Sequence, residues 1–511
     1  MVASGILLSR ILGLIRNRVF AHYFGTSDAA DAFNAAFKIP NVLQNLFGEG
    51  VLSASFIPVY AGLRASGDEV EARRVAGAVA ALLGLITSAL VLLGILLTPV
   101  LIGLIAPGFE GEKRDVTIRL VRILFPGAGL LVLSAWCLGV LNSHRHFFLS
   151  YSAPVVWNLA IIGALVGSGR GIGQYPLAEI AAWGSVVGSL LQFGIQLPTV
   201  LRLLHGTMPR LVRNSEPVQT VIRNFGPVFV GRGVVQISAY VDTVLASLLP
   251  TGAVAGLAYA QVLYTLPVSL FGMSVSAAEL PAMSSATGDE TERAAYLRTR
   301  LSGGLRQIAF LVVPSAVAFL GLGDVIAGAL YQSGEFTREV TLYVWGILAG
   351  SAVGLLASTL GRLYASTYYA MRDTRTPLRY AALRVALTII LGYLFALPLP
   401  RALGVDQRWG AAGLTASAGL AGWIEFLLLR RSLNRRIGPS GLSISLGVRL
   451  WGSAALAVVA AWLVRPILRP NQPLLTAAVV LTVYGGLYLL AATLLRVDEA
   501  RKLVGRLRRS G

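Results

Sequence analysis

A line of polar residues runs through one of the first apolar segments of the chain. The line comprises Asp31, Asn34, Lys38, Asn41, Asn45 and Glu49, with Pro40 in its middle. Spacings of three and four residues place all of them on one face of a helix. A charge at mid-membrane costs about 2.5–3.5 kcal/mol, so charges that persist there usually face a polar cavity. We predict that Lys38 and Asn41 bind a substrate and that the other members line or gate a cavity.

Arginines occur in two further apolar segments. Arg10 and Arg16 lie in the first predicted helix, and Arg232 and Asp242 lie in the seventh. The planar fork of arginine matches phosphate oxygens and keeps its charge at any cellular pH. The cargo is therefore predicted to be anionic, with Arg10, Arg16 and Arg232 among its ligands and Asp242 in the cavity wall.

A structural interpretation of these residues stays open. Asp31 and Lys38 can neutralise each other, and the asparagines can tie helices together by interhelical hydrogen bonds. Isolated carboxylates near helix ends can reach the membrane surface along their stems. Glu179 and Glu279 lie near the ends of the sixth and eighth predicted helices, and Glu425 lies in the twelfth.

The elements that hold these residues are membrane helices. The chain has 511 residues, of which 55% are hydrophobic and 13% charged, and its mean hydropathy is +0.70. Such a composition leaves too few polar residues to cover a soluble globule, and apolar runs of about twenty residues suffice to cross a bilayer core. The predicted helices are 3–24, 29–60, 74–107, 117–142, 149–168, 176–204, 225–249, 253–284, 302–331, 339–370, 377–398, 409–430, 445–465 and 473–495.

The basic residues indicate how these helices are oriented. About fourteen spans put both termini on one side, and most arginines and lysines of the connecting loops fall on that side. The positive-inside rule makes it cytoplasmic. The net charge of +19 thus reflects membrane topology, and no basic soluble domain indicates a nucleic-acid partner.

Motifs of catalysis are missing from the sequence. It contains no Walker loop, no histidine cluster with metal spacing and no GxSxG element. The single cysteine, Cys137, lies in an apolar run and fits helix packing. We predict a secondary transporter or flippase rather than an enzyme, with no cofactor, driven by the membrane potential or by a coupling ion, Na⁺ or H⁺.

Several longer motifs resemble the MurJ (MviN) lipid II flippase family of the MOP exporter superfamily. They are SRILGLIRNRVFAHYFG at 9–25, DAFNAAFKIPN at 31–41, FGEGVLSASFIPVY at 47–60, ELPAMS at 279–284, PSAVA at 314–318, LYQSGEFT at 330–337 and YYAMRDTRTP at 368–377. The likeness covers about the first 380 residues.

This resemblance implies an all-α fold of two six-helix lobes around a central cavity, with two additional C-terminal helices that form a lipid-facing groove. A faint likeness between 21–36 and 246–261 also points to two halves. The predicted parts are 1–224, 225–443 and 444–511. The implied cargo is lipid II, an undecaprenyl-pyrophosphate-linked disaccharide pentapeptide, and the family positions important for function match Arg10, Arg16, Asp31, Lys38, Asn41 and Glu49.

Departures from the family pattern keep other cargoes open. Gln44 and Val262 stand where many members have arginine, Thr265 replaces an acidic residue, and Asn17 stands where aspartate is common. The alternatives are a flippase for another undecaprenyl-linked glycan, such as an O-antigen or exopolysaccharide unit, and a non-transporting membrane scaffold that recruits cell-wall enzymes through its basic loops. A multidrug–cation antiporter of the same superfamily would need an acidic cavity instead.

Overall fold

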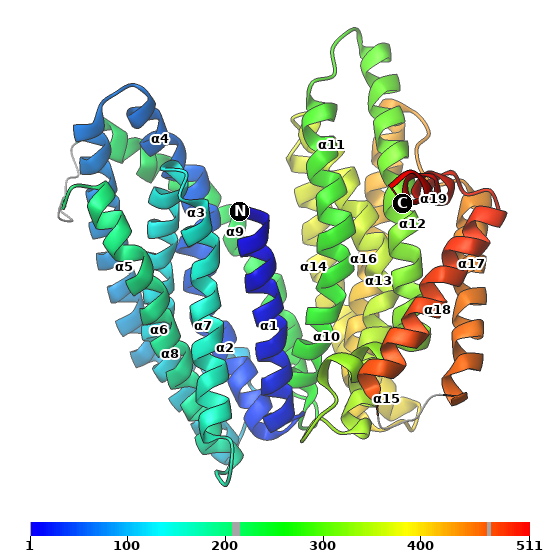
Figure 1. The fold of residues 1–511 in the computed structure, drawn as a ribbon, viewed down its shortest axis with the longest axis horizontal. Helices are drawn as coiled ribbons and strands as arrows, with labels where there is room; N and C mark the ends of the chain where they lie inside the picture. The colour runs from blue at the N-terminus through cyan, green and yellow to red at the C-terminus, as the bar shows by residue number, and fades with distance from the viewer. Residues whose placement is uncertain (1, 207–214, 468–471, 511) are drawn as a thin grey trace. The chain divides into compact units, whose positions relative to one another are not determined.

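Helices joined by short turns and loops make up the described part of the chain. The computed structural model describes residues 2–206, 215–467 and 472–510, and each element in these ranges is helical (Figure 1). Twelve segments of the described residues are long and apolar enough to cross a membrane. Helices α1 (Val2–Phe24) and α9 (Glu216–Ser247) are also long enough, although α1 carries Arg10, Arg16 and Arg18 within its span. The predicted all-α polytopic class is confirmed.

The described residues form two compact units. The N-terminal unit comprises Met1–Ala255 with Ser333–Glu335, and the C-terminal unit comprises Gly256–Gln332 with Phe336–Gly511. Helix α9 packs on α2, α3 and α5, so the contact boundary falls after Ala255, one helix later than the predicted boundary after 224. Residues 444–511 share contacts with the C-terminal unit. The predicted three-part division stays a prediction.

In the N-terminal unit, α6 and α7 both pack on α8, α2 packs on α6 and α1 packs on α7. Glycines permit the close contact of α7 with α8: a Cβ on Gly188 would lie 2.9 Å from the Trp157 carbonyl oxygen. The helices of this unit, besides α1 and α9, are α2 (Asp28–Phe47), α3 (Glu49–Ser55), α4 (Ile57–Ala65), α5 (Glu69–Ile105), α6 (Gly111–Ser143), α7 (Phe147–Ser168) and α8 (Gln174–Leu203).

The predicted helix 29–60 is interrupted. Helix α2 continues through Pro40 and ends at Phe47, and α3 begins at Glu49. A Cβ on Gly48 would lie 2.0 Å from the Gln44 carbonyl oxygen, so the break requires glycine at this position. A second break at Phe56, which the sequence analysis did not predict, separates α3 from α4.

In the C-terminal unit, α13 packs on α12 and α16, while α17 and α18 pair with each other and pack on α12. The α13 contact with α16 is close, since a Cβ on Gly354 would lie 2.4 Å from Gly419 Cα. The elements are α10 (Ala253–Pro267), which starts in the N-terminal unit, η1 (Val268–Met273), α11 (Ser274–Ser284), α12 (Glu290–Tyr331), α13 (Arg338–Ala370), α14 (Arg375–Ala396), α15 (Pro398–Ala402), η2 (Gln407–Trp409), α16 (Gly410–Ile437), α17 (Ile444–Val464), η3 (Arg465–Ile467), α18 (Pro473–Leu494) and α19 (Asp498–Ser510).

A proline explains how α18 attaches to α12. Pro314 lacks an N–H and so leaves the carbonyl of Phe310, four residues earlier, without its helical donor. The Tyr488 hydroxyl of α18 donates to this carbonyl at 2.6 Å, and the Tyr484 hydroxyl donates to the Pro314 carbonyl at 2.7 Å. Tyr488 thus satisfies a backbone carbonyl that lipid would leave unpaired, and Tyr484 adds a second contact one turn away.

Candidate functional site

Asp31 is the buried member of a polar cluster in the N-terminal unit. Its side chain is in the first turns of α2, after the Ser27 cap, and is 1% exposed. It accepts hydrogen bonds of 2.8 Å from Lys113 Nζ of α6 and from the backbone N–H groups of Gly252 and Ala255 at the start of α10. The negative charge also faces the positive end of the α10 helix dipole. Asp31 therefore joins three elements of the unit.

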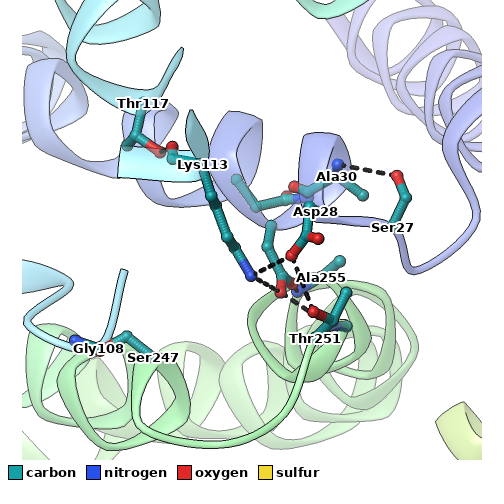
Figure 2. Close-up of polar contacts among 12 residues, drawn as sticks. Ser27, Asp28, Ala30, Gly108, Lys113, Thr117, Ser247, Thr251 and Ala255 are labelled. Atoms are coloured by element: carbon teal, nitrogen blue, oxygen red, sulfur yellow. Dashed lines mark hydrogen bonds and ion pairs between the residues drawn. The ribbon is translucent and has the colours of Figure 1, made fainter. Parts of the chain in front are cut away.

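Lys113 has a second carboxylate partner. Its Nζ lies 2.8 Å from Asp28 Oδ1, and the hydroxyl of Thr251 donates to the same oxygen at 2.8 Å. The Lys113 Nζ atom also lies over the Phe109 ring, 4.4 Å from the ring centroid. Figure 2 shows Lys113 reaching from α6 to the beginning of α2, beside the turn that leads into α10. We name Asp28, Asp31, Lys113 and Thr251 the α2–α6–α10 cluster.

This cluster corrects the alternative in which Asp31 and Lys38 neutralise each other. The two side chains do share a helix, but each finds a partner on another element. Lys38 Nζ donates to Thr243 Oγ1 of α9 at 2.6 Å, and Asp242 is the carboxylate that acts on it electrostatically. The Tyr240 hydroxyl donates to the Lys38 carbonyl at 2.9 Å. Lys38 therefore joins α2 to α9.

Arg16 is held on an aromatic surface. Its Nη2 and Nε donate to Asn17 Oδ1 at 2.9 and 3.3 Å, and its Cζ lies 4.8 Å from the Trp157 ring centroid. The Trp157 and Phe37 ring centroids are 6.0 Å apart, and Phe37 precedes Lys38 on α2. Trp157 thus lies between the arginine of α1 and the residue next to the half-buried Lys38. Its Nε1 is fixed by Ser185 Oγ at 3.2 Å.

The other predicted site residues differ in exposure. Asn34 donates to the Ala30 carbonyl at 2.8 Å, so its amide serves its own helix. Arg10 is exposed on α1, and Glu49 is exposed in the first turn of α3. Asn41, Asn45 and Asp242 are half-buried, and Pro40 is buried. The side chain of Arg232 lies outside the described residues.

Residues missed by the sequence analysis complete the arrangement. Lys113 was assigned to a loop because the predicted helix began at 117, whereas α6 begins at Gly111. A basic residue in a loop on the predicted outer side, where the positive-inside rule makes such residues rare, was the available signal. Thr243 and Tyr240 gave no signal, since hydroxyl groups are common in membrane helices.

The remaining carboxylates of the predicted spans pair with arginines. The Oε atoms of Glu179, Glu279 and Glu425 lie 2.7, 2.8 and 3.2 Å from nitrogens of Arg119, Arg300 and Arg384, respectively. Each carboxylate has its partner on a neighbouring helix of its own unit. These contacts support the structural interpretation of the three residues.

An apolar groove of about 320 Å³ lies in the C-terminal unit. Helices α10, η1, α12 and α18 form its walls, which include Leu266, Leu270, Leu311 and Leu481. Tyr484, which docks α18 on α12, also lines it. Such a groove suits a hydrocarbon chain, because its lining offers little to a polar ligand.

Comparison with known proteins gives a consistent result. The family described as "Lipid II flippase MurJ" matches residues 20–480. The chain is 32% identical over 502 residues to the probable lipid II flippase MurJ of Rhizobium meliloti, covering 94% of this chain and 89% of that protein. It is 31% identical over 463 residues to the lipid II flippase MurJ of Burkholderia cenocepacia, covering 89% and 87%.

Solved structures with similar folds carry related descriptions. A structure of lipid II flippase MurJ in an inward closed conformation aligns with a TM-score of 0.79 at 25% identity, covering 97% of this chain and 99% of that one. An inward-facing MATE-family multidrug transporter of the MOP superfamily aligns with a TM-score of 0.69 at 16% identity, covering 85% and 96%. The second likeness shows the fold alone.

Proposed function

The chain belongs to the lipid II flippase MurJ family, and we propose that it moves lipid II from the cytoplasmic to the outer leaflet of the bacterial inner membrane by alternating access. As a multi-pass inner-membrane protein of a flippase family, it acts as a transporter. In the proposed orientation both termini are cytoplasmic, because the more basic loops lie on that side.

The observation that carries the head-group part of this proposal is that Arg16, Trp157 and Phe37 lie in a row that ends at the residue next to Lys38 on α2. It holds a planar guanidinium on α1 and an ammonium group on α2 within one apolar helical unit. Lipid II carries a pyrophosphate, whose oxygens fit the two-pronged donor of arginine. In our proposal Arg16 and Lys38 bind the pyrophosphate, with Arg10, Asn41 and Arg232 as further ligands.

The apolar groove supports a separate place for the lipid tail. Its walls of leucine, phenylalanine and proline side chains match a segment of an undecaprenyl chain. The lipid tail would stay in the groove while the head group moves along the basic residues. The polar part of the cargo could then cross while the hydrocarbon tail stays out of water. The tyrosine contacts of α18 then serve transport by keeping one wall of the groove in place.

The α2–α6–α10 cluster suits a conformational role in the cycle rather than cargo binding. Asp31 is enclosed by its three donors, so a bulky pyrophosphate has no access to it in this structure. Alternating access requires helices to change their contacts, and an ion pair that fixes the start of α10 to α2 and α6 would hold one state. The residues that we propose as gating or cavity residues are Asp31, Asn34, Pro40, Asn45, Glu49 and Asp242.

The membrane potential is the proposed driving force. Outward movement of an uncompensated anionic head group from an inside-negative cytoplasm gains about 2.3 kcal/mol per charge per 100 mV. Arginine keeps its proton throughout, so the ligands need not titrate during the cycle. A Na⁺ or H⁺ gradient is the alternative source of energy.

An assay of lipid II exposure at the outer leaflet, in cells depleted of their own flippase, tests this function. Wild-type protein should restore exposure and growth, Arg16→Lys should impair both because the fork is lost, and Arg16→Ala should abolish both. Arg145→Ala, in the loop after α6, is a matched control and should leave exposure unchanged. Undiminished exposure with Arg16→Ala would remove Arg16 from the mechanism, and insensitivity to an ionophore would remove the potential as the drive.

The alternatives are less well supported by the comparisons. If the cargo is another undecaprenyl-linked glycan, the protein should restore growth in a strain that lacks the flippase for that glycan. It should then not restore growth in the strain depleted of its lipid II flippase. A scaffold without transport would not restore lipid II exposure, and Arg16→Ala would then change nothing in this assay. The likeness to MATE transporters, at 16% identity, carries no argument about cargo.

A further inference from the structure

The C-terminal helix α19 begins at the edge of the membrane. Helix α18 is a candidate span that ends at Leu494, and Leu495, Arg496 and Val497 alone connect it to α19. Arg496 has a φ of 59°, which turns the chain sharply. Figure 1 shows α19 running across α12 at a steep angle to α18. The first turn of α19 therefore lies at the depth of the lipid head groups.

One arginine fixes the direction of α19. Arg306 of α12 binds both acidic residues of the first turn: its Nη2 lies 2.7 Å from Asp498 Oδ2, and its Nε lies 2.7 Å from Glu499 Oε1. Val497 and Ala500 are buried against the unit. The contacts neutralise the acidic end of the helix and anchor it, so the charge that the rest of α19 presents is basic.

The sequence of α19 is that of an interfacial helix. Apolar residues at 500, 503, 504 and 507 follow a spacing of three and four, and Arg501 and Lys502 are exposed between them. The sequence continues with Arg506, Arg508 and Arg509. An amphipathic helix with apolar residues on one side and basic residues on the other lies in the plane of an anionic membrane surface.

We propose that α19 binds anionic phospholipid head groups of the cytoplasmic leaflet through Arg501 and Lys502. The choice of leaflet rests on the orientation given in the proposed function, whereas the choice of lipid rests on charge and depth. Near an anionic surface each basic residue strengthens binding about fivefold. Because Arg306 joins α19 to α12, lipid binding at α19 is linked to the helix that forms one wall of the apolar groove.

Binding of fluorescent phosphatidylglycerol to the full chain in a neutral detergent tests the proposal. The wild-type protein should prefer it to phosphatidylcholine, and Arg501→Gln/Lys502→Gln should weaken binding on the order of tenfold. Both side chains are exposed, so the substitutions should leave the fold intact. Equal affinity of the wild-type protein for the two lipids would overturn the proposal.

Arg293→Gln/Arg298→Gln is a control with the same loss of charge. Both residues are exposed on α12, about 20 and 12 Å further along the helix than Arg306, beyond a Debye length of about 8 Å. Binding should therefore stay unchanged. An equal loss in both double variants would show non-specific attraction by net charge and would also overturn the proposal.

Detergent micelles have no sides, so this outcome does not depend on membrane orientation. Gly505→Cys tests orientation separately: reaction with an impermeant maleimide only after cell lysis is expected. Reaction in intact cells would overturn the cytoplasmic placement, and with it the proposed direction of transport, while leaving the lipid preference standing.

Discussion

Each unit contains an aspartate that is 1% exposed, and the two are neutralised differently. In the N-terminal unit both oxygens of Asp31 are hydrogen-bonded, by Lys113 and by two backbone N–H groups. In the C-terminal unit Asp324 Oδ2 accepts hydrogen bonds from Arg338 Nη2 and Arg465 Nη2, each at 2.6 Å, while Oδ1 is buried with no hydrogen-bond partner among the described residues.

The exposure of the cationic partners should determine how much stability is lost when each aspartate is removed. The Lys113 side chain is 15% exposed, whereas those of Arg338 and Arg465 are 46% and 35% exposed. A guanidinium at the surface can return to water, but an ammonium group inside a helical unit and two helix-terminal N–H groups cannot. Asp31 should therefore be the stronger structural requirement, although both aspartates are equally buried.

The largest expected effect follows from Asp31→Ala. Two backbone N–H groups lose their buried acceptor, and Lys113 keeps only Asp28, which is 45% exposed, so the total cost should be about 3–5 kcal/mol. The thermal unfolding midpoint of the purified chain should fall strongly, and transport should be lost. Asp28→Ala is the matched control: its side chain is 45% exposed, and Lys113 keeps Asp31.

A double variant shows whether the cost of Asp31→Ala comes from the charge left behind. Replacing Lys113 by Met in the same chain removes the ammonium group, whose one remaining carboxylate partner is the 45% exposed Asp28, and should recover part of the stability. A drop in midpoint no larger than that of Asp28→Ala would show that the cluster is not needed for folding, and transport in the same samples would then decide its role in the cycle.

A smaller loss is expected from Asp324→Asn. Its two arginines keep access to water, so the cost should be about 1–3 kcal/mol, mostly from the hydrogen bonds that the carboxylate accepts. Thermal unfolding measures this effect, with Glu339→Gln as an exposed control of the same charge change on α13. A loss as large as that of Asp31→Ala would contradict the comparison, because exposure of the partners would then not matter.

A third aspartate, Asp373, provides the surface reference and the smallest effect. Hydrogen bonds from the Thr376 hydroxyl and backbone N–H, together with Arg436, lower the pKa of Asp373 from 3.8 to about 2. A carboxyl whose folded pKa is depressed stabilises the protein above its ordinary pKa, and this contribution is lost as the pH falls from about 4 to about 2. Unfolding midpoints measured across this window should fall less steeply in Asp373→Asn than in the wild type; parallel curves would show that the cap contributes nothing.

The helices were predictable because they depend on local sequence. Twelve predicted spans each correspond to one helix, whereas 29–60 and 253–284 each correspond to a series of helical segments, and the interruption at Gly48 falls where two glycines flank Glu49. Predictions failed where a helix leaves the apolar region. Helix α12 begins at Glu290 instead of 302, since its 42 residues span about 63 Å and hydropathy registers only the part within the membrane. Helix α19 was assigned to a basic tail for the same reason.

The polar stripe of α2 shows what the sequence alone determined and what it left undecided. Composition and spacing required Asp31 and Lys38 to lie on one face of a membrane helix, because helical period and hydropathy are properties of neighbouring residues. Their partners, Lys113 and Thr243, lie 82 and 205 positions away along the chain. Only helix packing brings such residues within 3 Å, and an ion pair forms with whichever charge that packing places in reach. Tertiary structure therefore decided which polar residues hold the unit together and that Arg16 lies against Trp157.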